Sequence, residues 1–427
     1  MSTTSKASQR LLSLLDENSF VEIGAGVTAR ATDFNLNAAD TPSDGVVTGY
    51  GVIDGNLVYV YSQDASVLGG SIGEMHAKKI VNLYDMALKM GAPVIGLIDS
   101  TGLRLQEASD ALNAFGELYA ASALASGVIP QISAVFGSCG GGLTLVPALS
   151  DFVYMEKDAK MFVNSPEAIP GNSAAKCDNS SAKFQAGEAG SVDMVADEAT
   201  IFASIRELVT MLPSNCESTA FDECEDDLNR ATEGIENCVG DTSIAVSMIA
   251  DNGVFVETKA EFAKDMVTGF IKINGDTVGV VANRTEIFDE DGKSTDKFDC
   301  ALSAKGAEKA SEFVNFCDAF EIPLLTLTNV AGFKACMCAE KRVAKEAAYL
   351  AAAFANATVP KVNVIIGQAF GTAGVVMNSK AMGADMTFAW DTAKIGMMES
   401  KLAAQIICDG KGADAIAECA KEYDALQ

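Results

Sequence analysis

A glycine-rich turn offers the first groups in this chain that could do chemistry. Gly137-Ser-Cys-Gly-Gly-Gly-Leu143 follows an apolar run typical of a buried strand and precedes a helix. Gly141 and Gly142 have no Cβ, so a ligand oxygen can approach their backbone N–H groups, and the helix dipole favours negative charge there. Two such amides form an oxyanion hole that can stabilise an enolate. The turn therefore predicts an anion-stabilising site, although glycines at such junctions also occur for tight packing alone.

A second turn of the same kind occurs later in the chain. Phe370-Gly-Thr-Ala-Gly374 also follows an apolar run, and when the two halves of the sequence are aligned, Gly141-Gly142 falls on Gly371-Thr372. Each turn lies late in its unit, which argues against a dinucleotide-binding turn. Two equivalent turns indicate two similar sites.

The chain offers few side chains for catalysis or metal binding. No nucleophile elbow, Walker loop or Ser/His/Asp set is visible. The single histidine, His76, lies with Lys78 and Lys79 in a basic spot that could meet a phosphate at a helix start, although a lone histidine is more often structural. Cys336-Met-Cys338 lacks a second pair and a nearby histidine, so we expect no metal site. Lys89 sits in a sequence like a biotin attachment site but inside a helix, which indicates an ordinary surface lysine.

The elements that must position the two turns repeat along the chain. The segment 93–102 reappears at 323–332 and the segment 130–137 at 360–367, with the same offset for both. Landmarks nearer the ends of the copies are shifted slightly further, as small loop insertions would cause. Landmarks held at nearly one spacing indicate a duplicated domain.

Each copy is predicted to be α/β. Hairpins at 51–61 and 271–281 turn on Asp-Gly and Asn-Gly, and a helix follows each of them, at 73–90 and 304–320. Buried strands and further helices then alternate, which indicates a mostly parallel sheet.

The repeat also predicts where the domains begin and end. We expect the two domains at residues 1–170 and 241–427, joined by a polar connecting segment at 171–240 that contains one helix, 197–211.

Composition limits the partners and the compartment. The net charge of −27 over 427 residues argues against nucleic acid or an anionic membrane as a partner, since both need a basic face. Eleven cysteines without a framework, and a start without an apolar signal core, predict a reducing cytoplasm. No window of about 18 uncharged apolar residues occurs, so we expect no membrane insertion.

The chain resembles the carboxyltransferase (β-type) subunits of biotin-dependent acyl-CoA carboxylases, such as propionyl-CoA carboxylase, and of methylmalonyl-CoA and glutaconyl-CoA decarboxylases. The similarity covers most of the chain. In the first half it rests on Tyr61-Ser-Gln-Asp64 with Gly69-Gly-Ser71, on residues 98–107, and on residues 126–133 with the Gly137 turn. In the second half it rests on residues 315–323, 357–362 and 388–393.

The resemblance implies a duplicated crotonase (ClpP/crotonase-like) spiral fold of two homologous domains, an N-terminal one for acyl-CoA and a C-terminal one for biotin. By that analogy, Gly141 and Gly142 hold the thioester or enolate oxygen, and Thr372 and Ala373 hold the ureido oxygen of biotin. No catalytic side chain or metal is implied, because biotin that has lost CO2 can itself take the acyl α-proton. The other implied contacts are Gly371 and Gly374 for biotin, Val375 for the shape of the acyl pocket, and Gly70, Ser71, His76, Lys79, Gly102 and Arg104 for CoA.

The resemblance also implies partners. Biotin would arrive on a separate biotin carboxyl carrier protein, and a biotin carboxylase or membrane decarboxylase subunits would complete the enzyme. The substrate would be a short-chain acyl-CoA of the propionyl/methylmalonyl, acetyl/malonyl or glutaconyl type. Related subunits form hexamers, built as a trimer of dimers, with each site shared between opposite copies of two subunits.

Several departures from the family leave alternatives open. Asn329-Val-Ala-Gly-Phe333 replaces the usual Asp-x-Pro-Gly-Phe, Gly371-Thr-Ala-Gly374 replaces Gly-Gly-Ala-Tyr, and Ala189–Asp193 lacks the histidine of Ser-Gly-x-Ala-His. The family's Arg-Gly-x-Val-Asp-Asp segment does not occur before Gln427. A catalytically reduced scaffold subunit therefore remains an alternative. So does a biotin-independent crotonase-fold acyl-CoA enzyme, although it lacks an acid/base Glu pair near the first turn.

Overall fold

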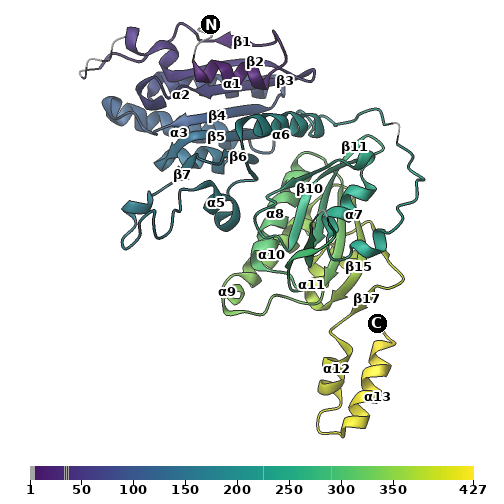
Figure 1. The fold of residues 1–427 in the computed structure, drawn as a ribbon. Helices are drawn as coiled ribbons and strands as arrows, with labels where there is room; N and C mark the ends of the chain where they lie inside the picture. Colours follow the sequence, from purple (N-terminus) through teal and green to yellow (C-terminus); the bar gives the residue numbers. More distant parts are fainter. Residues whose placement is uncertain (1–4, 33, 35, 37, 225, 290) are drawn as a thin grey trace. The chain divides into compact units, whose positions relative to one another are not determined.

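The computed structural model describes residues 5–32, 34, 36, 38–224, 226–289 and 291–427. The chain forms two compact units, Met1–Ala220 and Phe221–Gln427, each built from a sheet covered by helices (Figure 1). The α/β class and the duplication predicted from the sequence are therefore confirmed.

The sheet of the first unit has the order β1-β2-β3-β4-β5-β6-β8, and β7 pairs with the far end of β5. The first three strands pair antiparallel, and the remaining pairs are parallel. Its strands are β1 (Val21–Ile23), β2 (Val46–Ile53), β3 (Asn56–Gln63), β4 (Val94–Ser100), β5 (Gln131–Gly140), β6 (Phe152–Glu156), β7 (Lys160–Phe162) and β8 (Met194–Ala196). Its helices are α1 (Lys6–Leu14), α2 (Glu74–Met90), α3 (Ala108–Ala125), α4 (Leu145–Ala148), α5 (Ala182–Phe184) and α6 (Glu198–Met211).

The main sheet of the second unit has the order β16-β15-β14-β11-β10-β9, and β17 pairs with the far end of β15. Its strands, with the separate β12–β13 pair, are β9 (Phe255–Thr258), β10 (Met266–Ile273), β11 (Asp276–Asn283), β12 (Glu286–Phe288), β13 (Ser294–Lys297), β14 (Leu324–Val330), β15 (Lys361–Phe370), β16 (Met386–Ala389) and β17 (Lys394–Gly396). Its helices are α7 (Thr242–Ile249), α8 (Ala304–Ala319), α9 (Met337–Glu340), α10 (Val343–Asn356), α11 (Gly371–Val376), α12 (Ser400–Ile407) and α13 (Ala413–Asp424).

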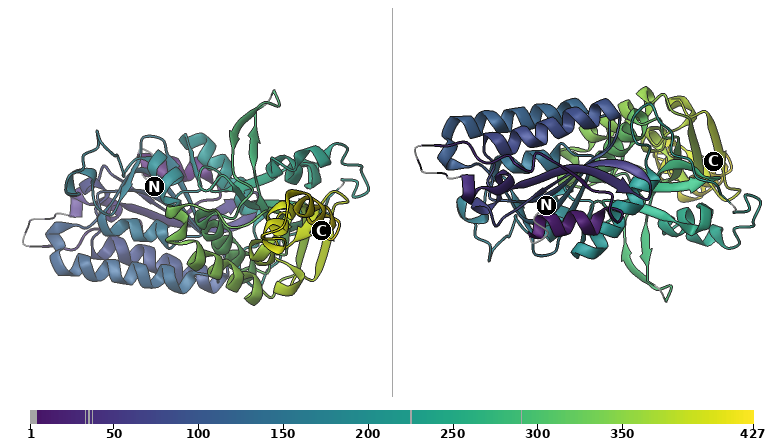
Figure 2. Two further views of the ribbon diagram at one scale, coloured as in Figure 1. Left: turned by 90° about the horizontal axis from the view of Figure 1, so that it is seen from below. Right: turned by 90° about the horizontal axis from the view of Figure 1, so that it is seen from above.

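The two sheets follow the repeat predicted from the sequence. β15 is the counterpart of β5 and β14 is the counterpart of β4, and both pairs keep the offset that relates the two halves of the sequence. Among the described residues of the first unit, the β12–β13 hairpin has no counterpart, and it projects from the second unit as an arm (Figure 2).

The hairpins that begin each copy share their chemistry. At both turns, residues 54–55 and 274–275, the two central residues have positive φ, as a type I′ turn requires. The carboxylate of Asp16 accepts the N–H groups of the first turn at 3.2 and 3.3 Å, and that of Asp251 accepts those of the second at 3.0 and 2.7 Å. An equivalent aspartate thus fixes the same turn in each copy.

Helices cover both faces of the first sheet. α2 and α3 lie side by side over one face (Figure 2), with the main apolar core between them and the strands. α1 and α6 pack together against the other face, where Phe202 of α6 meets Phe136 of β5 with ring centroids 5.4 Å apart.

The segment 171–240, expected as a connection, does not form a separate body. The predicted helix is present as α6, capped by Asp197, and β8 pairs with β6. Both belong to the first unit, because their apolar side chains complete its sheet and core.

Candidate active site

The first glycine turn lies where β5 ends and a helix begins. A 3-10 helix, Gly141–Thr144, follows Gly140 directly and continues into α4. Gly141 has φ 64°, and a Cβ added to it would meet no atom within 4 Å, so open space lies beside it. Gly142 is exposed. Since the first N–H groups of a helix have no intrahelical acceptor, the two amides lie at a solvent-facing turn where a ligand oxygen can reach them.

Two side-chain hydroxyl groups form hydrogen bonds that hold the first turn in place. Tyr119 Oη donates to the Gly142 carbonyl oxygen at 2.7 Å, and Thr144 Oγ1 donates to the Phe162 carbonyl oxygen at 2.8 Å. A Cβ at residue 142 would lie 2.8 Å from Tyr119 Oη. No side chain fits at position 142 without displacing that tyrosine.

The second turn has the same geometry. Gly371, φ 60°, is the first residue of α11, directly after β15, and Thr372 is exposed. Ala373 and Gly374 are buried, and a Cβ at Gly374 would lie 2.8 Å from the backbone carbon of residue 369. Val375 is 41% exposed. Gly371 and Thr372 thus match the first turn's Gly141 and Gly142 in position and exposure.

A polar side chain from the neighbouring strand contacts the strand that leads into each turn. Asp99 Oδ1 in β4 accepts the backbone N–H of residue 138 at 3.4 Å, and Asn329 Oδ1 in β14 accepts that of residue 368 at 3.0 Å. A Cβ at Gly137 would lie 2.0 Å from the Asp99 oxygen, and one at Gly367 would lie 2.5 Å from the Asn329 oxygen. Both positions need glycine because the polar side chain takes the space.

The glycines expected on the CoA side pack close to the first turn. Gly70 has φ 66°, and a Cβ there would lie 2.3 Å from the Asp99 carbonyl oxygen. Gly102 has φ 98°, and a Cβ there would lie 3.1 Å from the carbonyl oxygen of Gly140. The loop at residues 69–71 therefore packs on the end of β4, and Gly102, just after β4, packs on the end of β5 that carries the turn.

Arg104 anchors this loop from inside the unit. Its side chain is fully buried, and Nη1 pairs with Asp44 at 2.5 Å and with Glu107 at 2.9 Å. Nη2 donates to the Ser71 carbonyl oxygen at 2.6 Å. Burial raises the pKa of the Asp44 carboxyl, while Arg104 beside it favours the ionised form. The structure thus places Arg104 behind the loop rather than on its surface.

His76 is also interior. Its ring is completely buried, with Nδ1 2.9 Å from the Asp44 carbonyl oxygen and Nε2 3.2 Å from Gln63 Nε2. Burial, with help from the positive charge of Arg104, lowers the pKa of His76 to about 3. The neutral ring therefore donates through Nδ1 and accepts through Nε2, and both nitrogens already have partners. His76 therefore joins the backbone of Asp44 to the side chain of Gln63 inside the unit, and its ring does not face a phosphate in solvent.

Lys79 is also buried, and it has an equivalent, Lys309, in the second copy. Lys79 Nζ donates to Ser43 and to the Val46 carbonyl oxygen at the start of β2. Lys309, at the matching position of the repeat, donates to three carbonyl oxygens of residues 259, 262 and 266, at 2.9, 3.1 and 2.7 Å. Burial lowers the pKa of Lys79 to about 8 and that of Lys309 to about 7.

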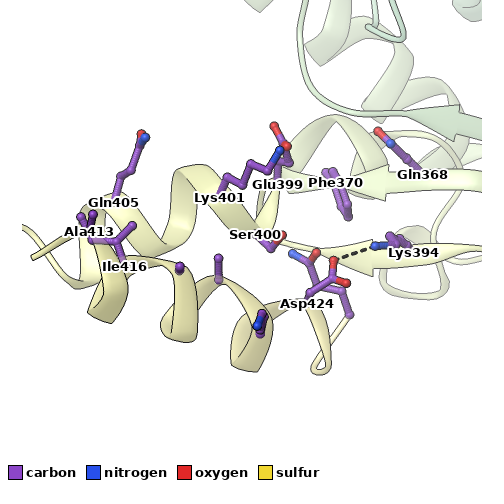
Figure 3. Close-up of a pocket in the computed structure, with 14 residues that line it drawn as sticks. Gln368, Phe370, Lys394, Glu399, Ser400, Lys401, Gln405, Ala413, Ile416 and Asp424 are labelled. Carbon is purple, nitrogen blue, oxygen red and sulfur yellow. Dashed lines mark hydrogen bonds and ion pairs between the residues drawn. The ribbon is translucent and has the colours of Figure 1, made fainter.

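A cavity of about 890 Å³ borders the second turn (Figure 3). Gln368 and Phe370 line it where β15 ends, and Lys394 of β17 forms an ion pair with Asp424 at 2.6 Å across it. Its other lining residues come from the C-terminal helices and their flanks: Glu399, Ser400, Lys401, Gln405, Ala413, Ile416, Ala417, Ala420, Lys421 and Gln427.

No metal centre stands out. Among the described residues, no group of three or more His, Cys, Asp or Glu side chains is placed to hold an ion. Cys336 and Cys338 are exposed at the start of α9, where Cys336 Sγ accepts the N–H of Ala339 at 3.3 Å and caps the helix. Within the part of the chain that the structure covers, none of the helices combines the length and apolarity that a membrane span needs.

Three features around the two turns were not predicted from the sequence. They are the contacts of Asp99 and Asn329, the paired lysines Lys79 and Lys309, and the cavity formed by α12 and α13. The repeat contained the signal for the first two, because both pairs keep the offset that relates the two copies. The cavity has no such signal, because it is formed by residues of α12 and α13 together with residues of β15 and β17.

Two glycine turns thus lie at equivalent strand ends of a duplicated α/β fold, each with an exposed residue at the start of a helix. Comparison with known proteins gives the particular family. The carboxyl transferase domain family matches residues 4–425 of this chain. The propionyl-CoA carboxylase beta chain of Roseobacter denitrificans is 41% identical over 434 residues, covering 98% of this chain and 83% of that protein. The methylmalonyl-CoA decarboxylase subunit alpha of Propionigenium modestum is 39% identical over 415 residues, covering 94% and 78%.

The solved structures agree. The transcarboxylase 12S subunit, crystallised as a hexamer with hydrolysed methylmalonyl-CoA bound, superposes with a TM-score of 0.91 and 35% identity over 99% of this chain and 83% of that one. The crotonase-like fold expected from the sequence is thereby confirmed. The chain belongs to the carboxyl transferase domain family, as a carboxyltransferase of the biotin-dependent acyl-CoA carboxylases and decarboxylases.

Proposed function

We propose that the first turn holds the thioester oxygen of a short-chain acyl-CoA through the N–H groups of Gly141 and Gly142. When the α-carbon loses its carboxyl group or proton, negative charge builds up on that oxygen. Amides already aimed at an open, solvent-facing turn stabilise this charge without rearranging. This proposal rests on the open space beside Gly141, together with the exposure of Gly142.

The loop at Gly70 and Ser71, with Gly102, is proposed to bind the CoA part of the substrate. Gly102 packs on the end of β5 that leads into the first turn, and Gly70 packs on the end of the neighbouring strand β4. His76, Lys79 and Arg104 are proposed to support binding indirectly, because their side chains are buried behind the loop and its neighbours. A methylmalonyl or propionyl substrate fits the names of the relatives.

The second turn and its cavity are proposed to receive biotin. Biotin, when bound, carries the carboxyl group that is exchanged with the acyl-CoA. Its ring system needs an N–H donor for the ureido oxygen and an apolar wall for the rest. Gly371, Thr372, Ala373 and Gly374 supply backbone amides at a helix start. Phe370 lines the cavity next to them, and Ile416 of α13 lines it at the other end (Figure 3). The residues present therefore fit the group, and Val375 is proposed to shape the acyl pocket.

The proposed partners follow from assigning acyl-CoA to the first turn and biotin to the second. Biotin would arrive on a separate biotin carboxyl carrier protein, and a biotin carboxylase or membrane decarboxylase subunits would complete the enzyme. The chain itself is proposed to assemble as a homohexamer, as the transcarboxylase 12S structure does.

The direct test is carboxyl transfer by the purified chain. The chain would be incubated with methylmalonyl-CoA labelled in its free carboxyl group and with free biotin in place of the carrier. We expect label to appear in carboxybiotin, with one propionyl-CoA formed for each carboxybiotin. Label that stays in methylmalonyl-CoA, in a chain that still assembles and still binds a biotinylated carrier, would instead identify a scaffold subunit. Propionyl-CoA formed without biotin would identify a biotin-independent decarboxylase.

A further inference from the structure

A continuous line of hydrogen bonds joins the buried ion cluster to the strand end beside the first turn. His76 Nδ1 lies 2.9 Å from the carbonyl oxygen of Asp44, and Gln63 Nε2 lies 3.2 Å from His76 Nε2. Gln63 Oε1 then accepts the N–H of Asp99 at 3.2 Å. The neutral histidine fixes the direction of every bond in this line, so the backbone of Asp99 has one favoured orientation.

The side chain of Asp99 is held by a buried arginine. Arg10 of α1 is 1% exposed, and its Nη1 lies 3.3 Å from Asp99 Oδ2 while its Nε lies 3.0 Å from Glu198 Oε2. The guanidinium carbon also lies 4.6 Å from the ring centroid of Phe136. Asp99 is 19% exposed, and a carboxylate so far removed from water needs a cation or donors close by. Arg10 thus keeps the carboxylate turned toward Gly137.

The second copy holds the corresponding strand end with an uncharged side chain. Asn329 takes the place of Asp99, and its N–H donates to Asn283 Oδ1 at 3.0 Å, as that of Asp99 does to Gln63. Ala245 takes the place of Arg10 in the aligned helix. The contact to the glycine that precedes the turn is kept in both copies. A neutral amide needs no cation, so the second copy is an uncharged version of the same contact within this chain.

We propose that Arg10 and Asp99 are positioning residues for the first glycine turn. Arg10 holds the Asp99 carboxylate against Gly137, and this contact fixes the end of β5 that carries Gly141 and Gly142. The inference rests on the proposed function of that turn for its effect on catalysis, but not for its effect on structure.

Three variants separate positioning from general stability. Arg10→Ala leaves Asp99 without its cation, so the carboxylate turns to water and releases the end of β5. The double variant Arg10→Ala/Asp99→Asn reproduces the neutral arrangement of the second copy. Arg206→Ala is the matched control, because Arg206 of α6 pairs with Asp16 and Asp54 at the first hairpin instead.

Hydrogen exchange read by mass spectrometry tests the structural part on the full-length chain. We expect Arg10→Ala to speed exchange at residues 137–142 while residues 361–376 keep the parental rate. The double variant should return residues 137–142 toward that rate, and Arg206→Ala should leave them unchanged. Parental exchange at 137–142 in Arg10→Ala would overturn the proposal. So would faster exchange spread over the whole first unit, or a double variant as mobile as the single one.

Transfer kinetics test the catalytic part. Misplaced amides stabilise the developing charge poorly, so Arg10→Ala should lower kcat on the order of tenfold to 10²-fold with little change in the KM for methylmalonyl-CoA. The double variant should recover most of kcat. A parental chain that transfers no carboxyl group would refute the proposed function, while the exchange result would still decide the positioning role. A parental kcat in Arg10→Ala would refute the catalytic part alone.

Discussion

At the scale of single residues, the functional groups proposed for both turns are backbone amides. A substitution there acts by blocking access or by moving the backbone, and the side chain that is lost has no role of its own. This explains how Thr372 can stand where the first copy has Gly142, since both residues keep their N–H group at an exposed position. It also explains how Asn329 can replace an aspartate, because its amide oxygen keeps the contact to the following strand.

Gly142→Val should abolish most carboxyl transfer. The new Cβ would lie 2.8 Å from Tyr119 Oη, so that tyrosine must move, and the branched side chain would crowd the exposed amides of the turn. We expect a loss on the order of 10²-fold in kcat, the effect of removing one oxyanion donor. Tyr119→Phe removes only the hydrogen bond to the Gly142 carbonyl oxygen and should cost far less.

Gly116→Ala in α3 is the control for that series, since a Cβ there would meet no atom within 4 Å. It should transfer at the parental rate. A folded Gly142→Val chain with parental kcat would place the chemistry elsewhere.

His76 should make the chain sensitive to acid. Its pKa is about 3 in the folded chain and about 6.5 when unfolded, so between these pH values the unfolded chain binds more protons. The contribution is complete above pH 6.5 and is lost as the pH falls toward 3, by at most about 1.4 kcal/mol per pH unit. His76→Gln cannot titrate, so its stability deficit relative to the parent should shrink between pH 7 and pH 5. Urea unfolding at both pH values measures this, and an equal deficit at both would show that His76 does not titrate as described.

At the scale of elements, the same polar contacts hold the same strands in both copies. Asp151 Oδ2 accepts the N–H of the first residue of β5 at 2.8 Å, and Asp385 Oδ2 does the same for β15 at 2.8 Å. Lys79 and Lys309 each bind carbonyl oxygens at the start of the first hairpin strand. These bonds satisfy backbone groups where strands begin, which explains why charged residues are buried there.

Lys309→Met should destabilise the second unit. The three carbonyl oxygens that Lys309 binds would lose their donor in a buried place, at a cost of about 1 to 3 kcal/mol. Lys297→Met is the matched control, because Lys297 is 73% exposed and its ion pair with Glu286 contributes little. The midpoint of urea unfolding should fall for the first variant and stay near the parent for the second. Equal midpoints would mean that water replaces the lysine.

Ala417→Trp should obstruct the biotin side without touching the acyl-CoA side. Residue 417 lines the cavity beside the second turn, and an indole there would fill part of it. Glu418→Trp places the same indole on the next residue of α13, which does not line the cavity. We expect a raised KM for free biotin only in Ala417→Trp, with the Kd for methylmalonyl-CoA unchanged in both. A raised Kd for methylmalonyl-CoA in Ala417→Trp would mean that the cavity belongs to the acyl-CoA side.

At the scale of the whole molecule, we propose that the chain presents two half-sites of one reaction. The first unit carries the turn proposed for acyl-CoA and the second carries the turn proposed for biotin. The net charge of −27 favours solubility of a large assembly at low salt.

Light scattering should find a hexamer at micromolar concentration. The transcarboxylase 12S subunit, 35% identical, forms a hexamer, and its fold matches this chain almost throughout. Several large apolar side chains of α12 and its neighbourhood are exposed in the single chain, among them Leu402, Ile406 and Ile407. Their contact with water would be unfavourable in a monomer. A stable monomer under these conditions would contradict the proposed assembly.

The sequence by itself determined the duplication, the α/β class and the two glycine turns. These depend on local patterns, because strand runs, Asp-Gly turns and strand-to-helix glycines are written in consecutive residues. The resemblance added the family, which the comparisons confirm. The sequence also placed Gly70, Gly102 and Arg104 in one region, and the structure brings them together beside the first turn.

Only the tertiary structure decided what the charged residues do. His76, Lys78 and Lys79 were expected as a basic spot for phosphate, yet His76 and Lys79 are buried, while Lys78 is exposed and pairs with Glu74. Arg104, which the resemblance assigned to the CoA side, is buried too and holds the Ser71 carbonyl oxygen and two carboxylates. Burial cannot be read from consecutive residues, because it depends on which distant segments cover a side chain. The partnership of Arg10 with Asp99 is of the same kind, since 89 residues separate them and only the packing of α1 against the sheet brings them together.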